Sequence, residues 1–336
     1  MPQKHIAVAG GSGTIGSSII RALCAKHKLY KPIVLSRATP TNPPGTLKTT
    51  TALVTTESGD VEVPLETRYV DYTSADSLHS ALVGVEAVIS ALLIPGPEIV
   101  PYQLNLLDAS IRAGVRRFAP SEFALPQAVH GDVDVDGGKI VVWDACRAAV
   151  ADGKIDAAAF PCGMFMNYLG IGAPEDRREE ALAGFREGPM IFHLDEQPQA
   201  GAGEWVEIPL TADGGYPDLT MTDIRDVGRF VVAALGLEEP WGGREMGMVG
   251  ETRNLGEIVR IIEGVLGRAV EVRAVERETL QRRLDGVAAG DILAQIDIQY
   301  TMVCGQGGSV VQPVLNGLCP DVKPTTIQGF MEKYWG

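Results

Sequence analysis

The stretch that decides the fold is HIAVAGGSGTIG, residues 5–16. An apolar run typical of a strand leads into a glycine-rich turn, and the residues that follow have the apolar spacing of a helix. Glycines in this context permit a tight turn, let the backbone approach a pyrophosphate and let the helix pack on the strand. The free N–H groups at the helix start then favour phosphate, whereas the alternative is a tight turn that binds nothing. We expect a dinucleotide site that comprises Gly10, Gly11, Ser12, Gly13, Thr14, Ile15 and Gly16.

The end of the second expected strand indicates which dinucleotide binds. A site for NAD usually places Asp or Glu there, where the carboxylate accepts a hydrogen bond from the ribose 2′-hydroxyl. This chain has Ser36 and Arg37 instead. A guanidinium can hold a 2′-phosphate through two parallel hydrogen bonds, and the serine adds a hydroxyl. The pair therefore predicts NADP(H), with a solvated surface arginine as the alternative.

Short apolar runs alternate with helical patterns through the first half of the chain. This order predicts an α/β fold, with a Rossmann-type doubly wound parallel sheet built from right-handed βαβ units. After the first strand we expect strands at 32–37, 67–71, 86–93, 115–120 and 155–161, with a small hairpin around 59–60. Helices are expected at 14–26, 74–82, 101–113 and 138–151.

Beyond residue 162 the pattern loosens, which predicts a smaller, partly interleaved C-terminal α/β substrate domain. We expect residues 172–188 and 195–217 to be irregular, a strand at 245–249, and helices at 223–235, 254–266 and 325–334. The predicted NADP(H)-binding domain covers 1–162, with 220–250 returning to it, and the predicted substrate domain covers 163–219 and 251–336.

Charge and cysteine content exclude several classes of function. The net charge of −14 disfavours nucleic acid and anionic membrane surfaces as partners. Five cysteines without a Cys-x-x-Cys pair indicate neither a disulfide framework nor a zinc site, and the histidines show no metal spacing, so we expect no metal. Free thiols and the lack of a signal-peptide pattern predict a cytoplasmic protein. We expect a monomer or a homodimer, with a small molecule as its partner.

In an open parallel sheet the ligand lies outside the carboxyl ends of the strands. Three expected strands therefore contribute further candidate cofactor-binding residues. These are Ser90, Ala91 and Leu92, then Ser121, Glu122 and Phe123, then Phe160, Pro161 and Cys162. For Cys162 the alternative is a buried and inert thiol.

Lys139 is the candidate catalytic residue, and it also counts among the cofactor-binding residues. It opens an expected helix after the acidic segment GDVDVDGG, residues 131–138, although cations are unfavourable at a helix start. Its ammonium can donate a proton or polarise an oxygen as a hydride arrives. The alternative is a solvated lysine that pairs with Asp134 or Asp136. His130, in the loop before Lys139, is a weaker candidate acid, because we expect it on the surface.

At this point several segments together resemble a known family. They are similar to the NmrA-like, isoflavone reductase-like group of atypical short-chain dehydrogenases. The similar segments are the glycine turn, Ser36-Arg37, VRRFAPSEFA at 115–124 and the closing PTTIQGFMEKYW. Lys139 also fits this group, because no tyrosine stands four residues before it, where this chain has Val135. The resemblance implies NADPH-dependent reduction of small aromatic or conjugated molecules, such as enones, quinone methides, benzylic ethers or polyketide-like compounds. It implies Lys139 as general acid or electrostatic anchor, and a substrate site that includes Met164, Phe165, Asn167 and Tyr168.

Two other functions stay open at this level. Some NmrA-like proteins are similar in fold but act as dinucleotide-sensing regulators that bind a protein partner without catalysis. An epimerase or dehydratase with a bound cofactor is the other alternative. For the apolar cluster after residue 160, ordinary core packing competes with a role at the substrate.

Overall fold

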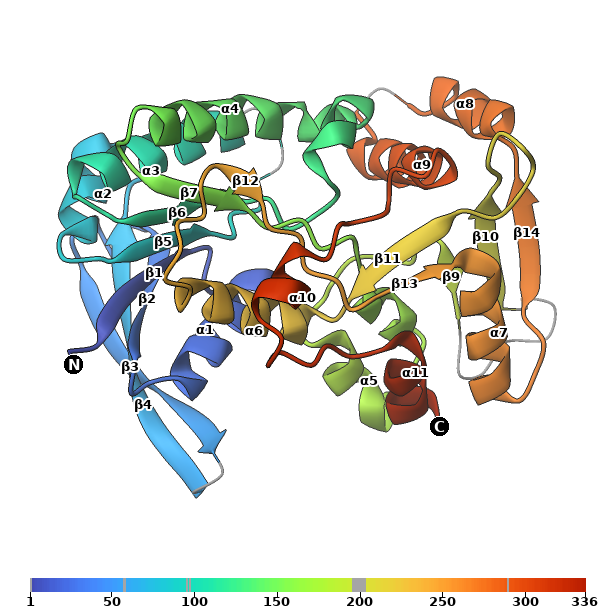
Figure 1. The fold of residues 1–336 in the computed structure, drawn as a ribbon, viewed down its shortest axis with the longest axis horizontal. Coiled ribbons are helices and arrows are strands. Elements are labelled where there is room, and N and C mark those ends of the chain that lie inside the picture. Colours follow the sequence, from blue (N-terminus) through green and yellow to red (C-terminus); the bar gives the residue numbers. More distant parts are fainter. Residues whose placement is uncertain (1, 57–58, 95, 97, 195–203, 289) are drawn as a thin grey trace.

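The computed structural model describes residues 2–56, 59–94, 96, 98–194, 204–288 and 290–336 (Figure 1). Within these ranges an eight-stranded sheet has the strand order β12-β7-β6-β5-β1-β2-β4-β3. Its strands are β1 (Lys4–Ala9), β2 (Tyr30–Arg37), β3 (Leu47–Thr56), β4 (Gly59–Val70), β5 (Ala87–Ser90), β6 (Arg117–Ala119), β7 (Asp156–Ala159) and β12 (Arg244–Glu245). All neighbours pair in parallel except β3 with β4. The predicted Rossmann-type parallel sheet is confirmed.

Helices cover both faces of this sheet, which explains why its central strands are apolar throughout (Figure 1). On β1, Ile6 and Val8 pack toward α1 (Thr14–Ala25) and α6 (Ile224–Leu235), in a cluster whose members Ile19, Leu23 and Val227 are fully buried. Ala7 and Ala9 on the same strand pack toward the other face. That face is covered by α2 (Ala75–Leu82), α3 (Ile99–Arg112) and α4 (Gly137–Ala151).

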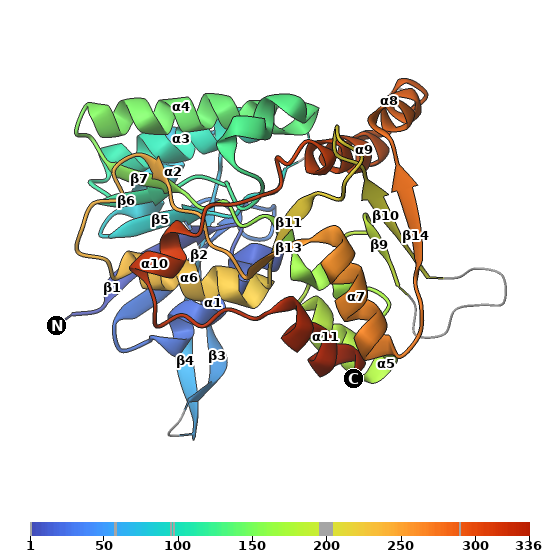
Figure 2. The same cartoon turned by 45° about the vertical axis from the view of Figure 1, so that its right-hand side comes forward.

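The third strand is much longer than the sequence pattern predicted. Strand β4 begins at Gly59 rather than at residue 67, and it forms a long antiparallel hairpin with β3 that projects from the sheet (Figure 2). Strand β3 carries the run Thr49–Thr51 and β4 carries Val61 and Val63, and such β-branched residues favour extended backbone even where one side faces solvent. The prediction missed β3 because its polar threonines are also typical of loops.

The C-terminal half forms two three-stranded sheets and a set of helices. The sheets contain β8 (Met164–Phe165), β11 (Asp218–Thr222) and β13 (Glu251–Asn254), and β9 (Phe192–His193), β10 (Trp205–Pro209) and β14 (Glu271–Val275). The helices are α5 (Glu175–Leu182), α7 (Leu255–Leu266), α8 (Arg277–Asp285), α9 (Ile292–Gly305), α10 (Val314–Leu318) and α11 (Ile327–Trp335).

Several expectations for this half are refined by the structure. Helix α7 begins as predicted, with the Asn254 side chain accepting a hydrogen bond from the Gly256 N–H. The segments predicted to be irregular contain α5 and β10, while 195–203 lie outside the described residues. The expected strand at 245–249 is reduced to β12.

Within the described ranges, no helix is long and apolar enough to cross a lipid bilayer.

Segments from both halves of the chain interleave. Helix α6 packs against α1, and β12 extends the first sheet beside β7, although both come after the first C-terminal strands (Figure 1). This path agrees with residues 220–250 returning to the cofactor-binding part. The domain limits themselves stay a prediction.

Candidate active site

The candidate site lies along the edge where the parallel strands end. Because β7, β6, β5, β1 and β2 run in the same direction, their carboxyl ends and the residues after them meet at one edge of the sheet. The register places Ala9 beside Ser90 on one side and beside Leu35 on the other. The glycine turn is therefore at the centre of this edge.

Two glycines of the turn have no room for a side chain. Gly10 has a φ of +73°, and a Cβ atom there would lie 2.6 Å from the Ala91 carbonyl oxygen. A Cβ on Gly16 would lie 2.1 Å from the carbonyl oxygen of Gly10, so this glycine lets α1 sit directly on the turn. Both distances are far below van der Waals contact. The tight turn predicted from the sequence is thus present, and its backbone is closely packed.

The start of α1 has the features of an anion-binding helix end. Gly13 is the N-cap and provides no side-chain hydrogen bond to the first turn. Ser12 and Gly13 are exposed, and the Thr14 hydroxyl donates a hydrogen bond to the Gly184 carbonyl, 2.9 Å away. Backbone N–H groups of an uncapped first turn are free to bind phosphate oxygens. The residues present therefore fit the pyrophosphate of a dinucleotide.

Ser36 and Arg37 end β2 next to this turn. The Gly10 N–H donates to the carbonyl of Leu35, the residue before Ser36. Arg37 is exposed, and within the described residues its guanidinium takes part in no ion pair. The exposed guanidinium therefore lies beside the glycine turn, and its role as the group that holds a ribose 2′-phosphate stays a prediction.

The residues after β5 and β6 are linked to each other. The Ser121 hydroxyl donates to the Leu92 carbonyl at 2.9 Å, and the Ala91 N–H donates to the Ala9 carbonyl at 2.8 Å. Ser90 is completely buried, and its hydroxyl has no hydrogen-bond partner. These contacts fix the backbone beside the glycine turn, where the predicted cofactor residues Ser90, Ala91, Leu92 and Ser121 lie.

Lys139 stands in the first turn of α4, at the same edge. Its Nζ atom lies 2.7 Å from Oδ1 of Asp136, and the side chain is 22% exposed. Of the two acidic partners considered from the sequence, Asp136 is the one it contacts, whereas Asp134 bonds to Gln299. Asp136 therefore neutralises a cation at a helix start that would otherwise be unfavourable, and it fixes the position of the ammonium.

Glu122 and His130 form a buried pair near Lys139, and the expectation of a surface histidine was wrong. Oε2 of Glu122 lies 3.7 Å from Nδ1 of His130, and their side chains are 1% and 0% exposed. Burial raises the pKa of Glu122 to about 8, against the attraction of Lys139. Burial and the nearby Lys139 lower the pKa of His130 to about 4. At neutral pH both groups are uncharged.

The remaining residues after β6 and β7 are mostly buried. The ring of Phe160 is fully buried, stacks on Phe123 with centroids 6.3 Å apart, and meets Trp241 edge to face. Pro161 accepts a hydrogen bond from the Met248 N–H. Cys162 is fully buried; burial raises the pKa of its thiol to about 12, although nearby Lys139 acts in the opposite direction. This thiol is inert at neutral pH, and a cofactor contact of these residues stays a prediction.

Of the four predicted substrate residues, two keep accessible surface and two are buried. Met164 and Phe165 are partly exposed. Asn167 is fully buried, and its amide donates to the Ala181 carbonyl and accepts from the Ile224 N–H. Tyr168 is 6% exposed, and its hydroxyl donates to Glu187. The Asn167 amide thus joins α5 to α6, and its contact with substrate stays a prediction.

Two residues beside Lys139 were not identified as part of a site from the sequence. Asp136 was considered only as a partner of a solvated lysine, although its spacing three residues before Lys139 was the available signal. Tyr300 on α9 donates a hydrogen bond to Oδ2 of Asp136 at 2.8 Å. No local pattern marks Tyr300, because the contact joins segments far apart in the chain.

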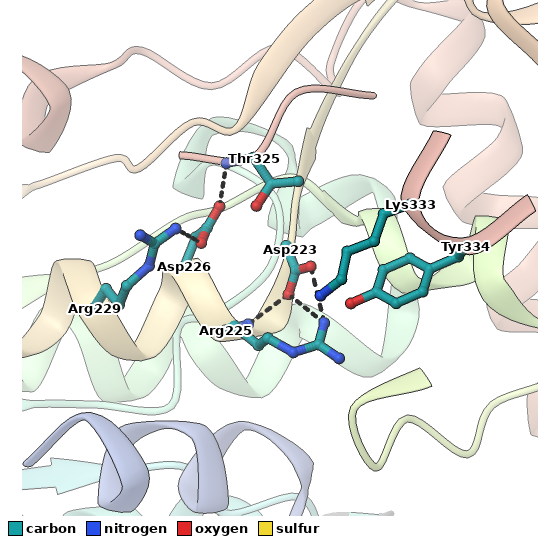
Figure 3. Close-up of a pocket in the computed structure, with 7 residues that line it drawn as sticks. All are labelled: Asp223, Arg225, Asp226, Arg229, Thr325, Lys333 and Tyr334. Carbon is teal, nitrogen blue, oxygen red and sulfur yellow. Dashed lines mark hydrogen bonds and ion pairs between the residues drawn. The ribbon is translucent and has the colours of Figure 1, made fainter. Parts of the chain in front are cut away.

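A separate pocket of about 240 Å³ lies beside α6, on the face of the sheet opposite α4 (Figure 3). Its cations are engaged by acidic side chains: Arg225 by Asp223, Arg229 by Asp226, and Lys333 by Glu180. The first two pairs lie within α6 and its N-cap, and the third joins α11 to α5, while the Thr325 N–H donates to Asp226 and so connects the C-terminal segment to α6. The residues that line the pocket are Asp223, Arg225, Asp226, Arg229, Thr325, Lys333 and Tyr334.

The model of the NmrA-like family matches residues 2–307. The chain belongs to the NmrA-like family. It is similar to oxidoreductase swnN of Metarhizium robertsii (strain ARSEF 23 / ATCC MYA-3075), with 34% identity over 359 residues that cover 98% of this chain and 97% of the relative. Oxidoreductase BOA1 of Botryotinia fuckeliana (strain B05.10) is 29% identical over 269 residues, which cover 78% of this chain and 76% of the relative. Both relatives are named oxidoreductases, in agreement with the class predicted from the sequence.

Solved structures confirm the fold. The structure described as AtPrR2 with NADP+ and (+)pinoresinol aligns over 99% of both chains, with a TM-score of 0.68 and 18% sequence identity. That protein was solved with the cofactor predicted for this NmrA-like chain.

Proposed function

We propose that this protein is an NADPH-dependent reductase that transfers a hydride to a small aromatic or conjugated substrate. Lys139 acts as the general acid or electrostatic stabiliser. The observation that carries the proposal is the partly exposed ammonium of Lys139, held by Asp136 at the sheet edge that also bears the glycine turn. The names of the two relatives and the cofactor of AtPrR2 support it.

The chain offers a binding surface for each part of the cofactor. The turn from Gly10 to Gly16 would hold the pyrophosphate through backbone N–H groups, and Ser36 and Arg37 would hold the 2′-phosphate. When bound, NADPH supplies the hydride. Ser90, Leu92 and Ser121 fix the backbone on the side of the turn toward Lys139.

Lys139 provides the charge that reduction of a conjugated system requires. Negative charge develops on the acceptor as it gains a hydride, and an ammonium fixed beside it stabilises that charge and can donate a proton. Glu122 and His130 are uncharged at neutral pH, so neither adds a charge beside the ion pair of Lys139 with Asp136. The Lys139 ammonium is thus held in place by one carboxylate.

The substrate class follows from the chemistry of this arrangement and from the relatives. A single cation suits an oxygen that takes up negative charge, either through conjugation, as in an enone, a quinone methide or a polyketide-like compound, or as the departing alkoxide when the C–O bond of a benzylic ether is reduced. The partly exposed Met164 and Phe165 provide apolar surface for the rest of such a molecule. The aromatic (+)pinoresinol in the AtPrR2 structure belongs to the same broad class.

The test is NADPH oxidation, followed by absorbance, with menadione, cyclohexenone and acetophenone as probes. We expect turnover with at least one conjugated probe. Tight binding of NADP(H) without turnover of any conjugated or aromatic compound would favour a dinucleotide sensor, and product formation without net NADPH consumption would favour an epimerase or dehydratase.

A further inference from the structure

Helix α9 contacts the short segment that carries Asp136 and leads into Lys139. The Gln299 amide donates to Oδ2 of Asp134 at 2.8 Å, and the Asp134 N–H donates back to Oε1 of Gln299 at 3.1 Å. The Tyr300 hydroxyl donates to Oδ2 of Asp136 at 2.8 Å. Two consecutive residues of α9 therefore bind both acidic side chains of this segment, residues 134–136.

An apolar contact supports these polar ones. Leu125, Val133 and Val303 form a buried cluster, against which Val129 and Tyr300 pack. Val133 directly precedes the acidic segment, while Val303 is one helical turn after Tyr300. Apolar burial on one side and three hydrogen bonds on the other fix α9 against the residues before Lys139. Residues 134–136 are therefore held in place, although they form only a single turn of 3-10 helix.

Asp136 is bound by a different group on each of its oxygens. Oδ1 faces the Lys139 ammonium at 2.7 Å, Oδ2 accepts from Tyr300, and the residue is 2% exposed. A buried carboxylate with both oxygens engaged has one favoured orientation. Burial and the negative charge of Asp136 raise the pKa of the Tyr300 phenol well above its ordinary value, so the phenol stays protonated and continues to donate.

We infer that Tyr300 is a positioning residue for Lys139. Tyr300 acts by orienting the Asp136 carboxylate, which in turn holds the Lys139 ammonium. This inference rests on the proposed function of Lys139. Tyr300 belongs to the part of the chain predicted to bind substrate, so the position of the ammonium depends on the docking of α9. The groups that face Lys139 and its carboxylate are Glu122 and His130 from the segment after β6, Cys162 after β7, and Tyr300 from α9.

The test compares Tyr300→Phe with Thr301→Val. Each variant removes one hydroxyl from α9, but the Thr301 hydroxyl donates to the Asp297 carbonyl within the helix and does not contact Asp136. With menadione as the probe, Tyr300→Phe should lower kcat about tenfold, as expected for loss of a hydrogen bond to a charged group, with KM for NADPH unchanged. Thr301→Val should keep the wild-type kcat. Equal kcat values in the two variants would overturn the inference.

The coupling between Tyr300 and Asp136 is tested by introducing Tyr300→Phe into an Asp136→Ala variant. If Tyr300 acts through the carboxylate, removal of its hydroxyl should have no further effect on kcat once the carboxylate is gone. A second tenfold loss in the double variant would show that Tyr300 acts independently of Asp136, and would overturn the inference.

A second readout does not depend on activity. In the cofactor-free protein, hydrogen–deuterium exchange of residues 133–139 should be faster in Tyr300→Phe than in wild type and unchanged in Thr301→Val. Exchange identical to wild type in both variants would overturn the inference even if menadione is not a substrate. Faster exchange in Tyr300→Phe together with an active Lys139→Met variant would contradict the proposed function alone.

Discussion

Glu122 and His130 are two titratable groups buried side by side, with Oε2 of Glu122 3.7 Å from Nδ1 of His130. Nε2 of His130 lies 3.1 Å from the Leu125 carbonyl oxygen, so this nitrogen carries the hydrogen. Among the described residues, both carboxyl oxygens of Glu122 and Nδ1 of His130 are buried without a hydrogen-bond partner. In their charged forms both groups would lose hydration that the protein does not replace.

The pair predicts a pH-dependent stability. Because the pKa of Glu122 in the folded protein is about 8, above its usual 4.5, the folded protein keeps a proton that the unfolded chain loses. The resulting stabilisation is complete below pH 4.5 and is lost as the pH rises through 8. Relative to Glu122→Gln, the wild-type free energy of unfolding should fall by about 4 kcal/mol between those limits.

This prediction is checked by urea denaturation of both proteins across the pH range. The lowered pKa of His130 makes its own stabilisation decline as the pH falls from 6.5 to about 4, but His130 is present in both proteins, so this effect cancels in the comparison. Parallel curves for wild type and Glu122→Gln would show that Glu122 titrates normally.

Gly16 is the position where the turn tolerates a side chain least. Gly16→Ala places a Cβ atom 2.1 Å from the Gly10 carbonyl oxygen, so α1 must move away from the turn. We expect the free energy of unfolding to fall by about 3 kcal/mol. We also expect NADPH binding, measured by fluorescence, to become undetectable. The control is Gly264→Ala in α7, where a Cβ meets no atom within 4 Å and the helix should gain about 0.5–1 kcal/mol. A Gly16→Ala protein as stable as wild type would contradict the described packing.

Arg37 should decide between the two nicotinamide cofactors. Arg37→Ala should weaken NADPH binding about 50-fold, because two charge-assisted hydrogen bonds to the 2′-phosphate are lost. NADH lacks that phosphate, so its Kd should change by no more than about twofold. Isothermal titration calorimetry measures both constants, with Arg147→Ala as a control, since Arg147 is an exposed arginine of α4 that pairs with Asp144. An equal loss for both cofactors would remove the argument for specificity.

The parts of the fold that local pattern determines could be predicted from the sequence. The turn at residues 10–16 combines glycine spacing with the change from strand to helix, and the buried central strands are recognisable as continuous apolar runs. The hairpin β3–β4 was expected only as a small one around 59–60, and its length was missed, because the threonines of β3 are compatible with both loop and strand. Pairing between β3 and β4 decides in favour of the strand, and that pairing is not visible in either segment alone.

The site was predictable only where it lies close in sequence to a motif. Glu122 was selected because it follows an expected strand, and Lys139 because it opens an expected helix after an acidic segment. The burial of His130 was not expected. Residues 127–132 are polar enough to suggest a surface loop, and Ala128, Gly131 and Asp132 are indeed exposed. His130 is nevertheless fully buried, within the segment that packs on the cluster of Leu125, Val133 and Val303. Tyr300 could not have been linked to Lys139, since their connection runs through a tertiary contact with Asp136.

The central claim is tested most directly by Lys139→Met, with Lys154→Met as its control. Lys154 is an exposed lysine that pairs with Asp152, so the control makes the same substitution away from the site. Under saturating NADPH, Lys139→Met should lower kcat for menadione by about 100-fold or more while the Kd for NADPH stays within about twofold of wild type. Wild-type turnover in Lys139→Met would contradict the catalytic role assigned to Lys139.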